Sequence, residues 1–425
     1  MRLAWFTPLN PRSAIGRCGV GIASALAALG HEVELWHADP GEPRPSRLPV
    51  RRFTPGPATA RTLRERFDLC IYNFGNYLPY HDGIFEIAAL HPGLAIVHDF
   101  VLHHFFAGWF LEKHQSPQDY FDALPALYPS LASRFPTPTA LVAARLWESD
   151  ELASFPFAAP ILENALAAVA HSRFQAGSLR THWPGPIDVI PLAYEIDSPA
   201  PSAASAPDPG ARPTILVIGH INPNKCVDHL LEALRGLSPV ELICAGPIDD
   251  KYRDRLQQLA AGLPSASSLT FTGFVSDEEM SRLLHRATLC ANLRKPVTEG
   301  ASASVIEEMF LSKPVLVYNE GFFAELPAHT VLRCTPESLS DTLRSALANP
   351  ASLSPIGRAA HLHATQTFTY PRYAESLDSV IARTVRQLPV HRVLDAVGRE
   401  LSAWGTSPGD GSAARYSATI ASLFR

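Results

Sequence analysis

A segment rich in proline, alanine and serine, residues 198–213, divides this chain into two stretches of the same kind. On each side of it, short runs of aliphatic and β-branched residues alternate with longer runs whose apolar residues recur at helical spacing. That alternation predicts parallel sheets with crossover helices. The segment itself has the composition of a linker. At 425 residues the chain exceeds what one hydrophobic core usually holds, so we expect two α/β domains.

The apolar runs predict a comparable set of strands on each side of the linker. Before it, we expect strands at residues 3–6, 31–36, 69–73, 94–98, 166–172 and 187–192. After it, we expect strands at 214–219, 240–245, 269–274, 288–293, 315–317 and 330–334. These runs place an N-terminal domain at 1–197 and a C-terminal domain at 214–375. A ligand is then expected in the cleft between the two.

From about residue 105 to 160 the first domain becomes aromatic and helical, with prolines that break it into short helices. Such an insert is suited to cover an acceptor pocket or to lie on a membrane surface. It lacks the Lys/Arg-rich polar face of a membrane-binding helix, so internal packing is favoured, with at most peripheral membrane contact. The tail after Phe368 is expected to be helical.

The composition excludes several classes of protein. A net charge of −5 gives no basic footprint for nucleic acid. The N-terminus lacks the pattern of a signal peptide, and no window reaches the continuous apolar length of a membrane span. None of the six cysteines forms a C-x-x-C pair, which favours buried thiols in a reducing compartment. We therefore expect a cytoplasmic protein.

The first expected strand is followed by a glycine-rich stretch with Gly16, Gly19 and Gly21, and then by a helix at about 22–29. The glycines do not stand in G-x-G-x-x-G order, and no acidic residue ends the second strand, so NAD binding is disfavoured. Two interpretations remain. The stretch is either a loop that lets the backbone approach a ligand, or a flexible connection.

Four potential metal ligands follow the strand at 94–98: His98, Asp99, His103 and His104. Adjacent residues on a helix point in different directions, so the two later histidines do not readily join His98 around one ion. No metal site is predicted. His98 stands at the carboxyl end of a strand, where open α/β sheets bind ligands, so it is either a contact to substrate or a buried core histidine. Asp99 equally suits the N-cap of the next helix.

The richest chemistry lies in Glu299–Val317, which reads EGASASVIEEMFLSKPVLV. Glu299 and Glu307 stand eight positions apart, with small residues between them and a helix-forming run after them. A helix N-terminus lined with small residues offers unpaired N–H groups to an anion. Carboxylates beside it are useful when the ligand also carries hydroxyls. A sugar nucleotide has both features.

A lysine stands at the corresponding edge of the same predicted sheet. Lys225 lies in the sequence GHINPNK, after the first strand of the second domain and just before a helix. There it would balance the charge of a diphosphate. Taken alone, a lysine is more often a surface residue, but its position after Gly219 and before a helix favours the functional interpretation.

Taken together, these segments resemble the retaining glycosyltransferases of family four, the glycosyl transferases group one, which have the GT-B fold. The matching segments are the E-x(7)-E motif with its following KPV, GHINPNK, FTGFVSDEEMSRLL, ANLRKPVTEG and EGFFAELP in the second domain, and CGVGIASALAALGHEV, VHDFVLHH and AHSRF in the first. The resemblance implies two Rossmann-like domains that face a central cleft. It makes the N-terminal domain the acceptor side and residues 214–375 the donor domain. The C-terminal helices, 376–425, are expected to cross back to the first domain.

The resemblance also implies how a nucleoside diphosphate sugar is held. Glu307 would accept hydrogen bonds from the ribose, and Glu299 from hydroxyls of the donor sugar. Lys225 would neutralise the β-phosphate as it leaves. The diphosphate would be bound by backbone N–H groups near Ala301, Ser302 and Ala303.

Further roles follow for residues on both sides of the expected cleft. Phe274 and Val275 would contact the base through their main chain. Gly19 would face the diphosphate from the first domain, and His98 would touch the sugar near the reacting carbon. His98, Lys225 and Glu299 are thereby the expected catalytic residues.

Three positions depart from the family pattern. The Arg that follows the family's first glycine, here Gly219, is replaced by His220, which removes or weakens one diphosphate cation. Cys226 and Ser312 stand where the family has glycine. The expected activity is transfer of a sugar, with retention, to a hydroxyl of a sugar, a lipid-linked or another acceptor in glycan synthesis. No cofactor and no metal are expected. The alternatives are a binding protein that has lost the chemistry, and a sugar-nucleotide epimerase or phosphorylase.

Overall fold

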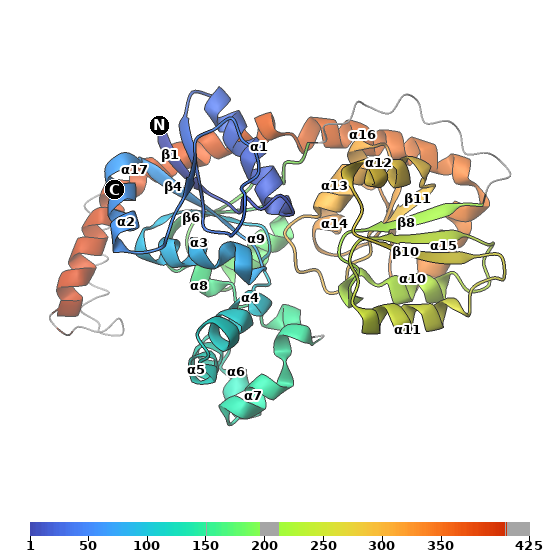
Figure 1. Cartoon of the computed structure of the whole chain (residues 1–425), viewed down its shortest axis with the longest axis horizontal. Coiled ribbons are helices and arrows are strands. Elements are labelled where there is room, and N and C mark those ends of the chain that lie inside the picture. Colours follow the sequence, from blue (N-terminus) through green and yellow to red (C-terminus); the bar gives the residue numbers. More distant parts are fainter. Residues whose placement is uncertain (150, 196–211, 404, 406–425) are drawn as a thin grey trace.

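The computed structural model describes residues 1–149, 151–195, 212–403 and 405. The expected linker, 198–213, lies almost entirely outside the described residues. The described residues before it and those after it in the sequence each form a sheet with covering helices (Figure 1). A group of short helices, α5 to α7, projects from the N-terminal domain at the bottom of the view.

Within residues 1–149 and 151–195, seven strands form one parallel sheet in the order β3-β2-β1-β4-β5-β6-β7. The strand order reverses beside β1, and the carboxyl ends of strands at such a switch point are where open α/β sheets bind ligands. The strands are β1 Arg2–Phe6, β2 Glu32–His37, β3 Val50–Arg52, β4 Leu69–Phe74, β5 Gly93–Val97, β6 Ala165–Ala170 and β7 Ile187–Val189.

Helices cover both faces of this sheet, as parallel strands require. They are α1 Ala14–Ala28, α2 Pro57–Arg66, α3 Leu78–Leu90, α4 His103–Gly108, α8 Ala159–Leu162 and α9 Arg173–Arg180. The insert adds η1 Trp109–Lys113, α5 Pro117–Leu127, α6 Ser130–Arg134, α7 Pro138–Ala144, η2 Leu146–Glu148 and η3 Leu152–Ser154.

Within residues 212–403, six strands form the second parallel sheet, in the order β10-β9-β8-β11-β12-β13. The strands are β8 Thr214–Ile218, β9 Glu241–Ala245, β10 Ser268–Gly273, β11 Leu289–Ala291, β12 Val315–Tyr318 and β13 Leu332–Cys334. The helical segments are η4 Pro223–Lys225, α10 Val227–Ala233, α11 Asp250–Ala260, α12 Asp277–Arg286, α13 Ala303–Phe310, α14 Gly321–Glu325, α15 Leu339–Ala348, η5 Pro350–Leu353, α16 Ser354–Thr367 and α17 Tyr370–Ala403. The predicted fold class, two Rossmann-like parallel-sheet domains, is confirmed.

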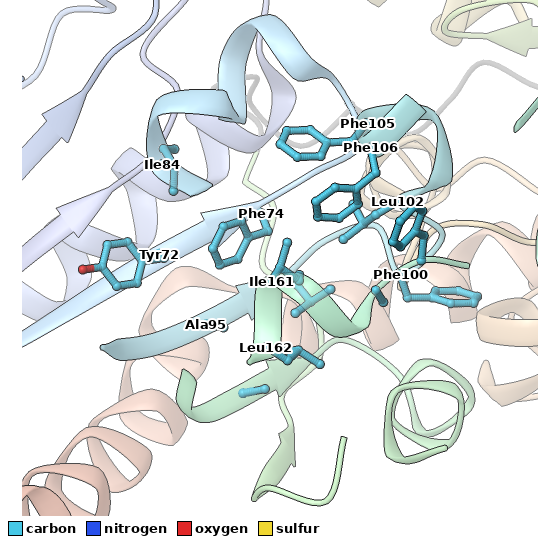
Figure 2. Close-up of a cluster of buried hydrophobic side chains, with 14 of the residues drawn as sticks. Tyr72, Phe74, Ile84, Ala95, Phe100, Leu102, Phe105, Phe106, Ile161 and Leu162 are labelled. Atoms are coloured by element: carbon cyan, nitrogen blue, oxygen red, sulfur yellow. The ribbon is translucent and has the colours of Figure 1, made fainter. Parts of the chain in front are cut away.

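The insert is packed onto the first sheet through its aromatic residues. Phe105 and Phe106 of α4 lie against Phe74 of β4, with Ile161 and Leu162 of α8 on the other side (Figure 2). The same cluster extends outward to Tyr120 and Phe157 of the insert. These side chains are buried, so the apolar residues of the insert serve the core of the N-terminal domain.

The glycine-rich stretch is part of a helix, which corrects the expectation of a loop before a helix at 22–29. α1 begins at Ala14 because the side chain of Ser13 caps it, accepting from the N–H of Gly16 at 3.0 Å. A Cβ at Gly21 would lie 2.3 Å from the ring of Tyr370 in α17. The glycine therefore allows α1 and α17 to pack closely.

The last described helix joins the two domains. α17 begins at Tyr370, after α16 of the second domain, and runs along the first domain (Figure 1). Tyr373, Leu377 and Ile381 are buried in the same cluster as Trp5 of β1. Among the described residues, no helix has the length and apolar character needed to cross a membrane.

Candidate donor site

The two domains meet where the chain leaves β5 and where it approaches α13. The N–H of Gly300 donates to the carbonyl of His98 at 2.8 Å, and the N–H groups of Phe100 and Val101 both reach the carbonyl of Thr298 at 3.3 Å. Asp99 and Glu299 form an antiparallel bridge. The loop with the first carboxylate of the E-x(7)-E motif is thus held against the carboxyl end of a strand in the opposite domain.

Gly300 can make this contact because glycine has no side chain. A Cβ there would lie 2.0 Å from Oε1 of Gln175, which is itself buried in α9. That side chain is fixed at both ends, because Oε1 accepts from the N–H of His171 at 2.7 Å and Nε2 donates to the carbonyl of Val97 at 2.6 Å. The loop can approach β5 this closely only with glycine.

A buried arginine stands beside Glu299. Arg294 is 5% exposed, and its Nε lies 3.3 Å from Oε1 of Glu299, while its Nη1 donates to the carbonyl of Leu293 at 2.9 Å. Oε1 of Glu299 is buried and has no hydrogen-bond partner among the described residues. A buried acceptor without a donor costs roughly 1–3 kcal/mol, so this atom is suited to a hydroxyl of a ligand.

Lys225 is a second buried cation in the same region. Its Nζ donates to the carbonyl of Ile218 at 2.5 Å and would lie 3.2 Å from a Cβ at Gly219. Burial and the neighbouring Arg294 lower the pKa of Lys225 to about 7, against the opposing effect of Glu299 and of Glu308. Two cations that destabilise each other in a buried setting favour the arrival of an anion.

Cys226 and Ser312 adopt the backbone conformation that glycine favours. Their φ angles are +50° and +57°, in the left-handed region. This explains in physical terms why the resembling family has glycine at both positions. The backbone of this chain follows the family pattern even where its side chains depart from it.

α13 begins beside these residues without a side-chain cap. Ser302 is its N-cap residue, but its hydroxyl lies 3.0 Å from that of Ser304 and caps no helix N–H. The hydroxyl of Ser304 in turn donates to Oδ1 of Asn292 at 3.2 Å. The first-turn N–H groups, near Ala301 and Ala303, are therefore free of competition from the N-cap side chain.

The two consecutive glutamates of α13 have different surroundings. Glu307 is half-buried, and burial raises its pKa against the effects of Arg17 and Tyr194. Glu308 is fully buried; both of its carboxyl oxygens accept from Nδ2 of Asn292 at 2.9 Å, and burial raises its pKa to about 8. Sequence reasoning identified Glu307 as a site residue and missed Glu308, the residue that follows it.

Arg17 reaches from the first domain toward Glu307. Its Nη1 donates to the hydroxyl of Tyr194 at 2.9 Å, and its Nη2 lies 3.4 Å from Oδ2 of Asp277 in the second domain. This residue was also missed. Only its place between Gly16 and Cys18 in the glycine-rich stretch could have drawn attention to it.

The other residues predicted for the site are His98, Gly19, Gly219, His220, Phe274 and Val275. The N–H of Gly300 meets the carbonyl of His98, whereas the ring nitrogens of His98 point to Asn73 and His171. Gly19 lies in α1 and packs on Thr7, whose Oγ1 would be 2.5 Å from a Cβ there. On the second domain, Gly219 and His220 are exposed and Val275 is half-buried. Phe274 is 72% exposed, with the guanidinium of Arg12 above its ring at 5.7 Å.

The structure therefore gathers Lys225, Glu299 and the start of α13 at one edge of the second sheet, together with Arg294, which sequence reasoning missed. His103 is a buried histidine that hydrogen-bonds the hydroxyl of Tyr120 at 2.7 Å. Within the described ranges, no group of three or more His, Cys, Asp or Glu side chains is arranged to hold a metal ion.

Comparisons with known proteins concern the family and the fold of the chain. The family model of glycosyl transferases group 1 matches residues 202–363. No curated protein matches the sequence. Sucrose-phosphate synthase from Thermosynechococcus elongatus is similar in structure, with a TM-score of 0.62 and 18% identity over 90% of this chain and 98% of that one.

Two further solved structures have the same architecture. Anabaena HepE in complex with UDP-glucose has a TM-score of 0.60 and 16% identity over 90% of this chain and 100% of that one. WaaG, a glycosyltransferase involved in lipopolysaccharide biosynthesis, has a TM-score of 0.56 and 16% identity over 89% of this chain and 98% of that one. These likenesses give both domains together the GT-B fold.

Proposed function

Because its second domain belongs to the glycosyl transferases group 1 and the whole chain has the GT-B fold, we propose that this protein is a retaining glycosyltransferase. It transfers a sugar from a nucleoside diphosphate donor to an acceptor hydroxyl of a sugar or a lipid-linked glycan. One observation carries the proposal. Oε1 of Glu299 accepts no hydrogen bond among the described residues, although it is ion-paired with the buried Arg294 and lies near the buried Lys225.

The two kinds of group in this site match the two ends of such a donor. Lys225, Arg294 and the uncapped start of α13 suit the negative charges of a diphosphate. Glu299 and Glu307 suit hydroxyls of the sugar and of the ribose. HepE, one of the similar structures, was solved with UDP-glucose, which supports a nucleotide sugar as the ligand class.

The chemical step requires stabilisation of the leaving group. As the bond between the anomeric carbon and the phosphate oxygen breaks, negative charge develops on the diphosphate, and Lys225 and Arg294 stabilise it. Glu299 is paired with Arg294, so we assign it to a sugar hydroxyl rather than to attack on carbon. The acceptor oxygen forms its bond on the face from which the diphosphate leaves, and its proton passes to a phosphate oxygen. Configuration is thereby retained.

The two buried cations supply positive charge without a divalent ion, so a metal-independent reaction is part of the proposal. Activity is expected to be unchanged in EDTA. Its loss in EDTA, with recovery on addition of Mg²⁺ or Mn²⁺, would refute this part.

A ligand panel tests the proposal directly. Thermal unfolding is measured with UDP, GDP and ADP and with their sugar conjugates, because a specific ligand stabilises by RT ln(1 + [L]/Kd). One nucleotide is expected to stand apart from the other two. The preferred sugar conjugate is then incubated with and without oligosaccharide acceptors. If none of the compounds raises the unfolding temperature, the proposed function is wrong.

A second candidate is a protein that binds the nucleotide sugar without turning it over. His220 favours it, because this residue replaces an expected cation and is exposed. Stable binding with no product from any acceptor would support this candidate. Consumption of the donor without acceptor would instead indicate an epimerase.

A further inference from the structure

A buried chain of polar contacts runs beneath the contact between His98 and Gly300. Nδ2 of Asn73 donates to the carbonyl of Phe6 at 2.9 Å, and Oδ1 of Asn73 lies 3.0 Å from Nε2 of His98. Nδ1 of His98 lies 3.3 Å from Nε2 of His171, and Nδ1 of His171 lies 3.1 Å from the carbonyl of Ile190. Both histidines are buried.

When both imidazole rings are neutral, this series of contacts lacks one proton. Each end is an acceptor, because the carbonyl of Phe6 fixes Asn73 with its oxygen toward His98, and the other end is the carbonyl of Ile190. Each of the three contacts between these ends needs one ring proton. A neutral imidazole carries only one N–H, so two rings supply one proton too few.

The longest contact identifies where the proton is missing. With His98 donating from Nε2 to Asn73 and His171 donating from Nδ1 to Ile190, the outer contacts of 3.0 and 3.1 Å are satisfied. Nδ1 of His98 and Nε2 of His171 then face each other across 3.3 Å with two lone pairs. Turning Asn73 over would only move the conflict to the carbonyl of Phe6.

We propose that His98 and His171 form a binding site for a single proton, shared between these two nitrogens, and that binding of an anionic donor loads it. A metal ion does not fit, because zinc takes at least three protein ligands, and among the described residues no group of three or more His, Cys, Asp or Glu side chains is arranged to hold one. One additional proton satisfies all three contacts and gives the pair one positive charge.

The surroundings explain why the site is empty without an anion. Burial lowers the pKa of His98, as do the nearby His171 and His81 of α3, and burial lowers the pKa of His171 to about 4. From α17, Tyr373 presents its ring to His171 at 5.9 Å, and its hydroxyl is held neutral because burial raises its pKa. Asp99, next in the chain, is half-buried, and desolvation raises the pKa of its carboxyl to about 6.

The donor site adjoins this pair through the backbone. The carbonyl of His98 accepts from Gly300, and Gln175 links the N–H of His171 to the same glycine loop. A diphosphate at Lys225 and Arg294 adds negative charge at this edge and raises the affinity of the pair for a proton. Donor binding and proton uptake are therefore coupled, and this coupling rests on the proposed function.

Histidine ring ¹⁵N NMR tests the pair without any ligand. In free protein at neutral pH, His98 is expected as the Nε2–H tautomer and His171 as the Nδ1–H tautomer. On acidification, Nδ1 of His98 and Nε2 of His171 should shift together in one step, as a coupled pair does. Two independent titrations, or protonation of one ring with the other unaffected, would overturn the proposal.

The variant His171→Gln provides a matched comparison. A glutamine N–H reaches toward Nδ1 of His98, so both ring nitrogens of His98 have a partner while the ring is neutral, and the shared titration should disappear while the protein stays folded. His104→Gln removes an exposed histidine of α4 and should leave the titration of the pair as it is in the wild type. Persistence of the joint shift in His171→Gln would count against the shared site.

Calorimetry with UDP-glucose in buffers of different ionisation enthalpy tests the coupling. This ligand has no group that titrates near neutral pH, and Lys225 contributes equally to wild type and variant. Wild type should take up more protons on binding than His171→Gln. Equal uptake would refute the coupling. If no nucleotide sugar binds, the proposed function fails, and the ¹⁵N titration of free protein still decides whether the pair exists.

Discussion

The backbone N–H of Gly300 donates to the backbone carbonyl of His98 at 2.8 Å, and this bond joins the two domains beside the proposed donor site. Gly300→Ala would place a methyl group 2.0 Å from the fixed carboxamide of Gln175. We expect the loop to move away from β5, which misplaces Glu299. Because positioning errors of about 1 Å can cost about 100-fold in rate, kcat should fall by roughly that factor.

The control for this change is Gly177→Ala. Gly177 lies in α9, two positions after Gln175, and no atom stands within 4 Å of the Cβ that alanine would add. It should stabilise the protein by about 0.5–1 kcal/mol and leave kcat unchanged. If the clash with Gln175 is the cause, the double variant Gly300→Ala, Gln175→Ala should recover part of the lost activity. Equal activity of Gly300→Ala and wild type would contradict the explanation.

A carboxylate from the second domain caps a helix of the first. Glu325 at the end of α14 accepts from the N–H of Phe174 at 2.7 Å and from that of Arg173 at 3.0 Å, at the start of α9. Glu325→Ala removes this charge from a helix N-terminus and should weaken domain closure by about 1 kcal/mol. Small-angle scattering should show a more open molecule, and the KM for the donor should rise.

Glu320→Ala is the matched control for Glu325→Ala. Glu320 is the N-cap residue of the same helix, α14, but its carboxylate meets Lys295 in an exposed pair at 3.6 Å. Exposed pairs of this kind contribute little, so neither the scattering curve nor the KM should change. An unchanged scattering curve for Glu325→Ala would show that the cap does not hold the domains together.

Strong periodic signals in the sequence predicted the fold class, whereas contacts between distant segments were not predictable. The apolar runs found the long strands, because parallel strands are buried on both faces. They missed β3, Val50–Arg52, which is short and exposed at the sheet edge. The start of α1 was placed too late because glycines were taken to interrupt a helix, and their contacts with Pro8 and Tyr370 are tertiary.

The same distinction applies to the candidate site. Lys225, Glu299 and the start of α13 were found because their residue types and spacing match a ligand with phosphates and hydroxyls. Arg294 was missed although it stands five residues before Glu299, because an arginine in a loop is usually exposed. His171 was missed as a partner of His98 because a pairing across two strands leaves no local pattern.

Lys225 and Arg294, the two buried cations, are each expected to stabilise the diphosphate leaving group. Lys225→Ala and Arg294→Gln are each expected to lower kcat by about 10²–10³, the usual effect of removing one preorganised group of this kind. Measured affinities should show a loss for UDP and none for uridine, since only the diphosphate meets these side chains. Lys251→Ala, at an exposed site in α11, should change neither. A loss of uridine affinity equal to that of UDP would indicate a disrupted fold.

The lowered pKa of Lys225 predicts how the free energy of unfolding changes at alkaline pH. Its pKa falls from 10.5 to about 7 in the folded protein, so between these values the unfolded chain binds more protons. Stability from this group therefore rises as pH increases from about 7 toward 10. Urea unfolding of wild type and Lys225→Met at a series of pH values measures the difference. A wild-type advantage that shrinks with rising pH would contradict the assignment.

For Glu308, the free energy of unfolding is expected to fall with rising pH, and over a lower pH range than that of Lys225. Burial raises the pKa of its carboxyl from 4.5 to about 8, so the folded protein binds the extra proton between these values. The stability from this group is present below about pH 4.5 and is lost as pH rises through 8. Glu308→Gln keeps an acceptor for Asn292 and removes the titration. Relative to this variant, wild type should lose about 2–3 kcal/mol of unfolding free energy between pH 5 and 7.

Asp99→Asn provides the comparison for Glu308→Gln, because burial raises the pKa of Asp99 only to about 6. The difference between wild type and Asp99→Asn should therefore level off above pH 6, whereas that for Glu308→Gln continues to grow toward pH 8. Denaturant unfolding of the three proteins across this range separates the two groups. If the Glu308→Gln difference is flat from pH 5 to 8, Glu308 is ionised throughout and pairs with Lys225 as a buried salt bridge.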